Sequence, residues 1–171
     1  MSEPTGPVAY CRRWNFKKNK PIDPMTAEQA AARDRTGELY SVTLSDTAED
    51  IIPEAVIERE NGHARVWFFD EVGRQSLSYS FRPHGDRLFL HNITSWEYPD
   101  DEARGLSSSI KIDNFEYQET GVVSRTTTDK AAGERLLDER TDVDVTHHWE
   151  PAPTFGDWGS ISRWSRVTPV S

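Results

Sequence analysis

The sequence predicts an all-β protein, an antiparallel meander of about nine strands curled into a barrel or half-barrel, with an N-terminal arm and one short helix. Apolar and polar residues alternate in short segments between residues 39 and 167, as Leu77, Tyr79 and Phe81 show. A period of two is typical of strands with one buried and one exposed face. Turn residues separate these segments, which favours sequential antiparallel pairing in a sheet that can enclose a ligand.

The N-terminal arm, residues 1–37, is expected to pack on a barrel domain formed by residues 38–171. Residues 8–16 are interpreted as a first strand or a covering arm. Their Trp14 and Phe16 are expected to pack on the body of the protein, while the neighbouring cations stay in water.

One helix is predicted over residues 26–35, after two prolines that break the chain. Thr26 followed three residues later by Gln29 has the pattern of a capping box, in which each side chain satisfies a backbone N–H of the other residue. Gly37 is expected to end the helix.

The clearest β-hairpin is predicted around Asn61-Gly62, because this dipeptide favours the two-residue turn that matches strand twist. In that register Glu58 lies opposite Arg65, a favourable cross-strand pair. Residues 129–137 are interpreted as a loop with some helical character. The predicted strands cover residues 39–44, 55–60, 63–70, 74–82, 87–98, 108–119, 122–128, 140–149 and 160–167.

Two breaks in the alternation predict β-bulges. Leu88 and Leu90 are out of phase with Ile93, and Ile112 is out of phase with Phe115. A bulge inserts one residue in one strand and so restores the burial of both groups.

Composition and cysteine usage limit the compartment and the number of domains. A chain of 171 residues favours one domain, and its apolar surface is concentrated in 6 Trp, 7 Phe and 5 Tyr. Cys11 is the only cysteine, so no disulfide can form within the chain. The N-terminus lacks the features of a signal peptide, and no apolar run is long enough to span a membrane. We therefore expect a cytoplasmic protein without membrane association.

The charge distribution disfavours nucleic acid as a partner. Five cations lie between residues 12 and 20, whereas the chain from Pro21 onward holds 28 acidic and 15 basic residues, a net charge of −13. A negatively charged body repels phosphate. No phosphate-binding glycine loop, nucleophile elbow, zinc motif or cysteine pair is present, so neither a cofactor nor a metal is expected.

The candidate catalytic residues are His147, Tyr79 and Tyr117. In a strand over residues 140–149, His147 faces inward and suits proton transfer near neutral pH. The two tyrosines offer hydroxyl donors in an apolar lining. Each of the three can also be an ordinary core residue without a catalytic role. His148 and its acidic neighbours could bind a cation, but we interpret them as a charged row exposed to solvent.

The candidate binding residues combine one cation with several rings. Arg125 faces inward toward an anion if it shares the orientation of Val123, and lies in water in the opposite register. The expected aromatic lining of the ligand cavity consists of Trp67, Trp96, Trp149, Phe81 and Phe115.

The chain resembles the calycins, the lipocalin-like small β-barrels, in its size, its sequential strands, Trp14 near the start, and Arg163 and Arg166 in the last predicted strand. In that family the early tryptophan packs under the late arginine. The resemblance implies a ligand-holding barrel over about residues 14–167. The glycine of the family's Gly-x-Trp pattern is missing, and Lys130 replaces the tyrosine of its Thr-Asp-Tyr element.

These observations predict a small-molecule-binding barrel with an aromatic-lined cavity. A small apolar or aromatic molecule is the expected partner, and turnover as a cofactor-independent cyclase, isomerase or lyase of a biosynthetic pathway would explain the absence of motifs. Two alternatives stay open: a ligand carrier without turnover, and an acidic inhibitor, of the immunity type, that blocks a basic protein. Formation of a homodimer is also left open.

Overall fold

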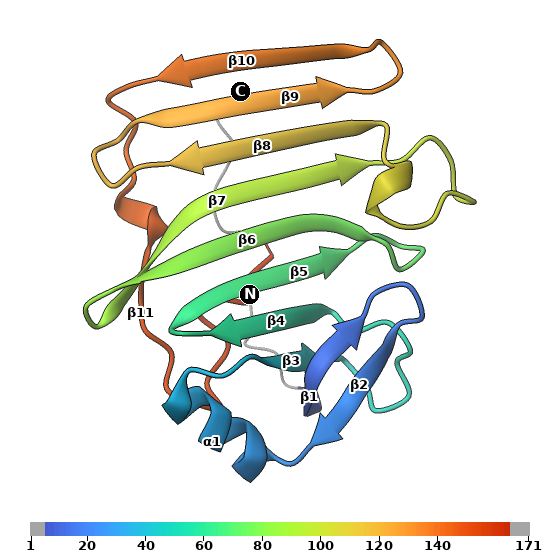
Figure 1. The fold of residues 1–171 in the computed structure, drawn as a ribbon, viewed down its shortest axis with the longest axis vertical. Coiled ribbons are helices and arrows are strands. Elements are labelled where there is room, and N and C mark those ends of the chain that lie inside the picture. The colour runs from blue at the N-terminus through green and yellow to red at the C-terminus, as the bar shows by residue number, and fades with distance from the viewer. Residues whose placement is uncertain (1–5, 165–171) are drawn as a thin grey trace.

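A computed structural model describes residues 6–164 of this protein as a single antiparallel sheet with one α-helix (Figure 1). The 11-stranded sheet has the order β10-β9-β8-β7-β6-β5-β4-β3-β1-β2, and β11 pairs with β7 beside this path. The elements are β1 (Val8–Asn15), β2 (Lys20–Met25), α1 (Ala27–Thr36), β3 (Tyr40–Leu44), β4 (Ala55–Glu60), β5 (His63–Phe69), β6 (Gln75–His84), β7 (Arg87–Glu97), η1 (Leu106–Ser108), β8 (Lys111–Tyr117), β9 (Val123–Asp129), β10 (Glu134–Arg140), η2 (Thr146–His148) and β11 (Trp149–Pro151).

The meander is confirmed, but the barrel is wrong because the sheet stays open. Closure would require the two edge strands, β10 and β2, to pair, and they lie at opposite ends of the sheet. After β10 the chain leaves the edge, forms η2, and pairs with β7 in the middle of the sheet as β11. The last part of the chain thus covers one face of the sheet instead of closing it.

The N-terminal segment forms two strands of the same sheet, β1 and β2, and the helix α1, which packs on the core through Ala30. β1 pairs with both β3 and β2. β2 was not predicted, because it contains the prolines at positions 21 and 24. Proline lacks the N–H that a central strand needs, but an edge strand tolerates it. The predicted helix is confirmed: Gln29 N donates to Thr26 Oγ1, Thr26 N donates to the Gln29 side chain, and Gly37 ends α1 with a φ of 76°.

The β4–β5 hairpin follows the predicted register. Glu58 pairs with Arg65 across β4 and β5, and Asn61 and Gly62 both have positive φ values in the turn. In β7, Leu90 pairs with Phe81 and Asn92 with Ser80, so the extra residue between them forms the predicted bulge. The second predicted bulge is wrong: β8 pairs with β7 without a shift, and Ile112 lies on the opposite face from Phe115.

Three predictions for the last third of the chain are wrong. Residues 134–137, predicted as part of a loop, belong to strand β10, and all seven side chains of this strand are exposed. Residues 141–148, read as a strand, form a bend and a 3-10 turn, because Asp142 has a positive φ and Asp144 Oδ1 accepts the N–H of Thr146 at 2.9 Å. Such a side-chain bond offers the backbone an alternative to strand pairing. Residues 160–164 form no strand, and residues 165–167 lie outside the described residues.

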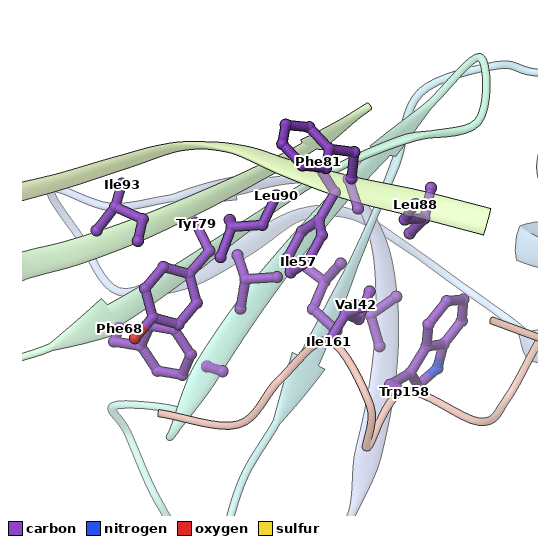
Figure 2. Close-up of a cluster of buried hydrophobic side chains, with 14 of the residues drawn as sticks. Val42, Ile57, Phe68, Tyr79, Phe81, Leu88, Leu90, Ile93, Trp158 and Ile161 are labelled. Carbon is purple, nitrogen blue, oxygen red and sulfur yellow. The ribbon is translucent and has the colours of Figure 1, made fainter. Parts of the chain in front are cut away.

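The core lies on one face of the sheet, called here the core face. Residues 152–164, the C-terminal segment, pass behind the strands in Figure 1, and their Trp158 and Ile161 point toward Val42 and Ile57 (Figure 2). Ala30 of α1 joins the same cluster. The buried residues of this face include Tyr40, Val42, Leu44, Ile57, Val66, Phe68, Tyr79, Phe81, Leu88, Leu90 and Ile93.

The single thiol offers a direct test of the β1–β3 pairing. Cys11 is 1% exposed, and burial raises the pKa of its thiol to about 11. Two pKa units leave about 100-fold less thiolate than an ordinary cysteine holds. We expect an aromatic disulfide reagent at pH 8 to label the native protein at least about 100-fold more slowly than the urea-unfolded chain. Equal rates would mean that β1 is not held on β3.

Candidate functional site

The aromatic side chains expected to line a cavity on the core face are packed together. Tyr79, Phe81, Phe115 and Tyr117 are between 1% and 5% exposed. The Tyr79 hydroxyl donates to the backbone carbonyl of Trp164 at 2.6 Å, so the C-terminal segment uses that polar group. These side chains build the core against which the C-terminal segment packs.

The two histidines exchange the places that the alternation predicted. His147 is exposed, because η2 turns it away from the sheet. His148 is 1% exposed, its Nδ1 lies 2.8 Å from the Leu90 carbonyl oxygen, and its ring centroid lies 4.2 Å from that of Tyr117. The expectation that His147 faces inward is therefore wrong, and Tyr117 has a different histidine as its neighbour.

Arg125 takes the orientation of Val123, on the side of the core face, and its anion comes from the protein. Its Nε lies 3.1 Å from Asp113 Oδ1, and its guanidinium lies 5.1 Å from the Phe115 ring centroid. Burial alone would raise the Asp113 pKa, but hydrogen bonds from Arg125 and Thr127 outweigh it and lower that pKa below its ordinary value. Arg125 thus acts as a structural partner of Asp113.

Trp149 contributes to an open pocket of about 420 Å³ at the end of the sheet where β8 turns into β9. Glu119 borders this pocket, and its carboxylate pairs with Arg82 and His84. The Arg87 guanidinium lies 4.2 Å from the Trp149 ring centroid. The pocket is lined by Glu119, Thr120, Gly121, Val143, Asp144, Val145, Thr146 and Trp149.

Trp67 and Trp96 meet on the face opposite the core face, called here the Trp67 face. Their ring centroids are 5.5 Å apart at an angle of 31°, and Phe16 of the β1–β2 hairpin packs 5.3 Å from Trp67. The Arg65 guanidinium lies 4.1 Å from the Trp67 ring centroid, and Glu58 Oε2 accepts the indole N–H at 2.8 Å. We call Arg65, Trp67 and Trp96 the Trp67 site.

A row of polar side chains adjoins the Trp67 site. Trp67 pairs with Ser78, Ser78 with Thr94, and Thr94 with Asn114, so the row crosses four neighbouring strands. The Thr94 hydroxyl lies 2.8 Å from Asn114 Oδ1, and the Asn92 amide donates to the same oxygen at 2.7 Å. Such a network can hold the polar groups of a ligand in defined positions.

Several buried polar atoms near this site have no hydrogen-bond partner among the described residues. On the Trp67 face they are Ser41 Oγ, Ser78 Oγ and Arg65 Nε, and a fourth, Trp14 Nε1, belongs to the hairpin that carries Phe16. Buried polar atoms are almost always paired, and exceptions point to bound water, an ion or a ligand. Arg59 Nε and the Tyr117 hydroxyl on the core face, and Ser162 Oγ in the C-terminal segment, are buried without a partner as well, so such atoms occur on both faces of the sheet.

Electrostatics single out Arg65 within the site. Burial lowers the pKa of its guanidinium, and the charge of Glu58 acts in the opposite direction. The side chain remains a cation, because an arginine pKa starts far above neutral pH. A partly buried cation with an unpartnered Nε suits a ligand that carries a negative charge or a carbonyl oxygen.

Sequence reasoning had placed Trp67 and Trp96 among the binding residues but had missed Arg65 as a third member. The signal was present, because Arg65 and Trp67 are two residues apart in a predicted strand and therefore share a face. The hairpin pattern by itself indicates Arg65 only as the cross-strand partner of Glu58. The packing of Phe16 on Trp67 follows the prediction for the arm, and Lys17 and Lys18 beside it are exposed.

Neither a metal-binding cluster nor a membrane-spanning helix is found in the described part of the chain. Between residues 6 and 164, His, Cys, Asp and Glu side chains form no group of three or more that could hold a metal ion. In the same range, no helix is both long and apolar enough to cross a membrane.

Comparison with known proteins leaves the family open. No family model matches this chain, and no curated protein or solved structure matches it either. What the chain shares with the calycins is an antiparallel meander, in a sheet that is open. Arg163, expected to cover Trp14, instead pairs with Glu150, and Arg166 lies outside the described residues.

Proposed function

We propose that this protein binds a small planar aromatic molecule with an acidic group, on the Trp67 face of the sheet. The observation that carries the proposal is the stack of Arg65 on Trp67 beside Trp96, next to buried polar atoms without partners. Residues expected to catalyse a reaction, His147, Tyr79 and Tyr117, lie outside this site. We therefore propose binding without catalysis. The proposed binding site lies on an open face of the sheet, and not inside a barrel as the sequence predicted.

In this proposal the tryptophan rings bind the ring of the ligand, and the Arg65 guanidinium binds its acidic group. Trp67 is only 5% exposed, so it supports the site from beneath, while the half-buried Trp96 and Arg65 are open to a ligand. A planar ring stacked on indole gains dispersion and buries apolar area. A carboxylate placed at the guanidinium of Arg65 gains a charge-assisted hydrogen bond, which is about twice as strong as a neutral one.

Local charge favours an anion in spite of the net charge of −9. The hairpin turn that brings Phe16 onto Trp67 also carries Lys17 and Lys18, both exposed. A positive segment beside the site attracts anions over roughly a Debye length, about 8 Å at physiological salt. The acidic remainder of the surface repels larger polyanions, which favours a small ligand over a nucleic acid.

Naphthoate is a suitable probe, because it combines a flat ring system with one carboxylate. Titration calorimetry is expected to show binding to the wild-type protein, and Arg65→Gln should weaken it roughly 10- to 100-fold through loss of the charged hydrogen bond. The neutral amide naphthamide should bind more weakly to the wild type and respond little to Arg65→Gln. Trp96→Ala should weaken both probes.

Arg87→Gln is the matched control, because Arg87 stacks on Trp149 at 4.2 Å much as Arg65 stacks on Trp67 at 4.1 Å. This control variant should bind naphthoate like the wild type. If Arg87→Gln weakens binding and Arg65→Gln does not, the ligand occupies the pocket beside Trp149. If neither probe binds the wild type, the proposal fails.

A second candidate function is the binding of a basic protein. Asp46, Asp50 and Glu54 crowd together in the β3–β4 loop, where burial and the two aspartates raise the Glu54 pKa. Such crowding indicates a negative potential that a cationic partner would relieve. Native mass spectrometry of protein purified from its own cells separates the two functions: a small adduct favours the ligand, and a complex with a basic protein favours the second candidate.

A further inference from the structure

The sheet ends in an exposed edge at β10. In the described part of the chain β10 pairs only with β9, so the backbone groups on its other side are free to pair with another strand. All seven of its side chains are exposed, and Leu136 and Leu137 are 63% and 75% exposed. Two adjacent leucines on an edge strand lie on opposite faces of the sheet, so both faces carry an apolar side chain there.

The opposite edge of the sheet is blocked, which makes β10 the edge suited to pairing. β2 carries Pro21 and Pro24 within its six residues. Proline has no backbone N–H to donate and so discourages a further strand. β10 contains neither proline nor glycine, and it lies on the outermost rim of the molecule in Figure 1.

The sequence of β10, Glu-Arg-Leu-Leu-Asp-Glu-Arg, is complementary to itself when two copies run antiparallel. With Leu137 opposite Leu137 of the second copy, Glu134 lies opposite Arg140 and Arg135 lies opposite Glu139. The two-fold symmetry repeats each pair, which gives four opposite-charge pairs. Cross-strand pairs of this kind stabilise a sheet, and like charges destabilise it.

Other symmetric registers match the charges poorly. In a two-fold symmetric antiparallel pair, the same face of the sheet lies on the same side in both copies. Residues opposite each other must therefore point to the same face, which limits the possible shifts of the register. A shift in one direction places Glu134 opposite Asp138, and a shift in the other places Asp138 opposite itself. The register centred on Leu137 is the one that charge selects.

The same register also buries the exposed leucines. Leu137 and its copy meet directly on the Trp67 face, because Leu137 pairs with Thr126 and Thr126 with Asn114. On the core face Leu136 lies opposite Asp138 of the second copy, and the two Leu136 side chains lie diagonally across the axis, within reach of long side chains. Apolar contact on both faces thus accompanies the charge pairs.

We propose that β10 is a dimerisation edge, at which a second copy of this chain pairs antiparallel in the register centred on Leu137. The dimer carries one continuous sheet through both copies, with the two Trp67 faces on the same side. One strand of seven residues is a small interface, so the dimer is expected to be weak and to depend on protein concentration. The proposal does not depend on the ligand proposed above.

Sedimentation equilibrium of the full chain, from low micromolar to the highest soluble concentration, tests the proposal. The wild type is expected to move from the mass of one chain toward that of two. Arg135→Glu places acidic side chains opposite each other in two symmetric pairs, and Glu139→Arg does the same with basic ones. Each single variant should raise the dimer dissociation constant at least about tenfold.

Mixing the two variants provides the decisive control. Neither Arg135→Glu nor Glu139→Arg dimerises well alone, but an equimolar mixture restores opposite charges in both pairs and should recover the dimer. Circular dichroism checks that each variant keeps the sheet, which is expected because both side chains are exposed. A monomeric wild type, a dimer that ignores both substitutions, or a mixture that stays monomeric would each overturn the proposal.

Discussion

Replacing Trp158 with alanine is expected to lower the free energy of unfolding by about 3–5 kcal/mol, the range for truncating a large buried aromatic side chain. Trp158 belongs to no helix or strand, yet it is 3% exposed. Its ring packs 6.4 Å from that of Tyr40 and 5.5 Å from that of Phe155, and its indole N–H donates to the Tyr10 hydroxyl at 3.4 Å.

The effect should be large because residues 6–164 form one open sheet, and no second sheet among them covers its core. The C-terminal segment performs that role, and Ile161, fully buried, lies three residues after Trp158 (Figure 2). Removing the indole leaves a cavity between this segment and β3, and an irregular segment cannot slide as a unit to fill it.

Trp164→Ala is the matched control, with the same substitution in the same segment. Trp164 is 61% exposed, and its contact with Tyr79 uses a backbone carbonyl that alanine keeps. We expect a change within about 0.5 kcal/mol. Urea unfolding followed by circular dichroism measures both variants. Equal effects would mean that the C-terminal segment does not seal the core.

Asp34→Ala is expected to cost about 3 kcal/mol of stability, because it leaves the Arg59 guanidinium buried without its anion. The side chain of Arg59 is 8% exposed, with one nitrogen 3.7 Å from Asp34 Oδ1. The same oxygen accepts the hydroxyl of Tyr40 at 2.7 Å. Burial, followed by the Asp34 carboxylate, raises the Tyr40 pKa, so the phenol remains a donor across the physiological range.

An exposed ion pair with a shorter distance is the control for this prediction. Arg12 Nε lies 2.8 Å from Asp23 Oδ2, but these side chains are 50% and 65% exposed. Arg12→Ala should change the free energy of unfolding by less than about 0.5 kcal/mol, because water screens the pair and solvates whichever charge remains. A larger loss for Arg12→Ala than for Asp34→Ala, in the same urea titration, would contradict the role given to burial.

Local sequence patterns predicted the elements whose causes are local. The capping box of α1 depends on Thr26 and Gln29, three residues apart, and the Asn61-Gly62 turn depends on two neighbours with positive φ. The bulge in β7 could be predicted because β7 is buried at both Leu90 and Ile93, and burial imposes the alternation.

Alternation of apolar and polar residues could not predict strand β10, which has no buried face. β10 has no alternation because neither side of it is covered, and its charged and leucine-rich sequence has high helix propensity. The alternation of residues 143–149 is real, but the Asp144 side chain turns the backbone there. His147 was therefore assigned to the wrong side, and His148 holds the buried position.

The sequence by itself determined an all-β meander, the register of the β4–β5 hairpin, the capped helix and a chain rich in aromatic residues. Tertiary structure decided whether the sheet closes, and which aromatic residues meet. Closure and the Trp67 site both depend on contacts between residues far apart in the chain, such as β11 with β7 and Phe16 with Trp67. A period of two reports which side chains share a face, and it carries no information about what covers that face.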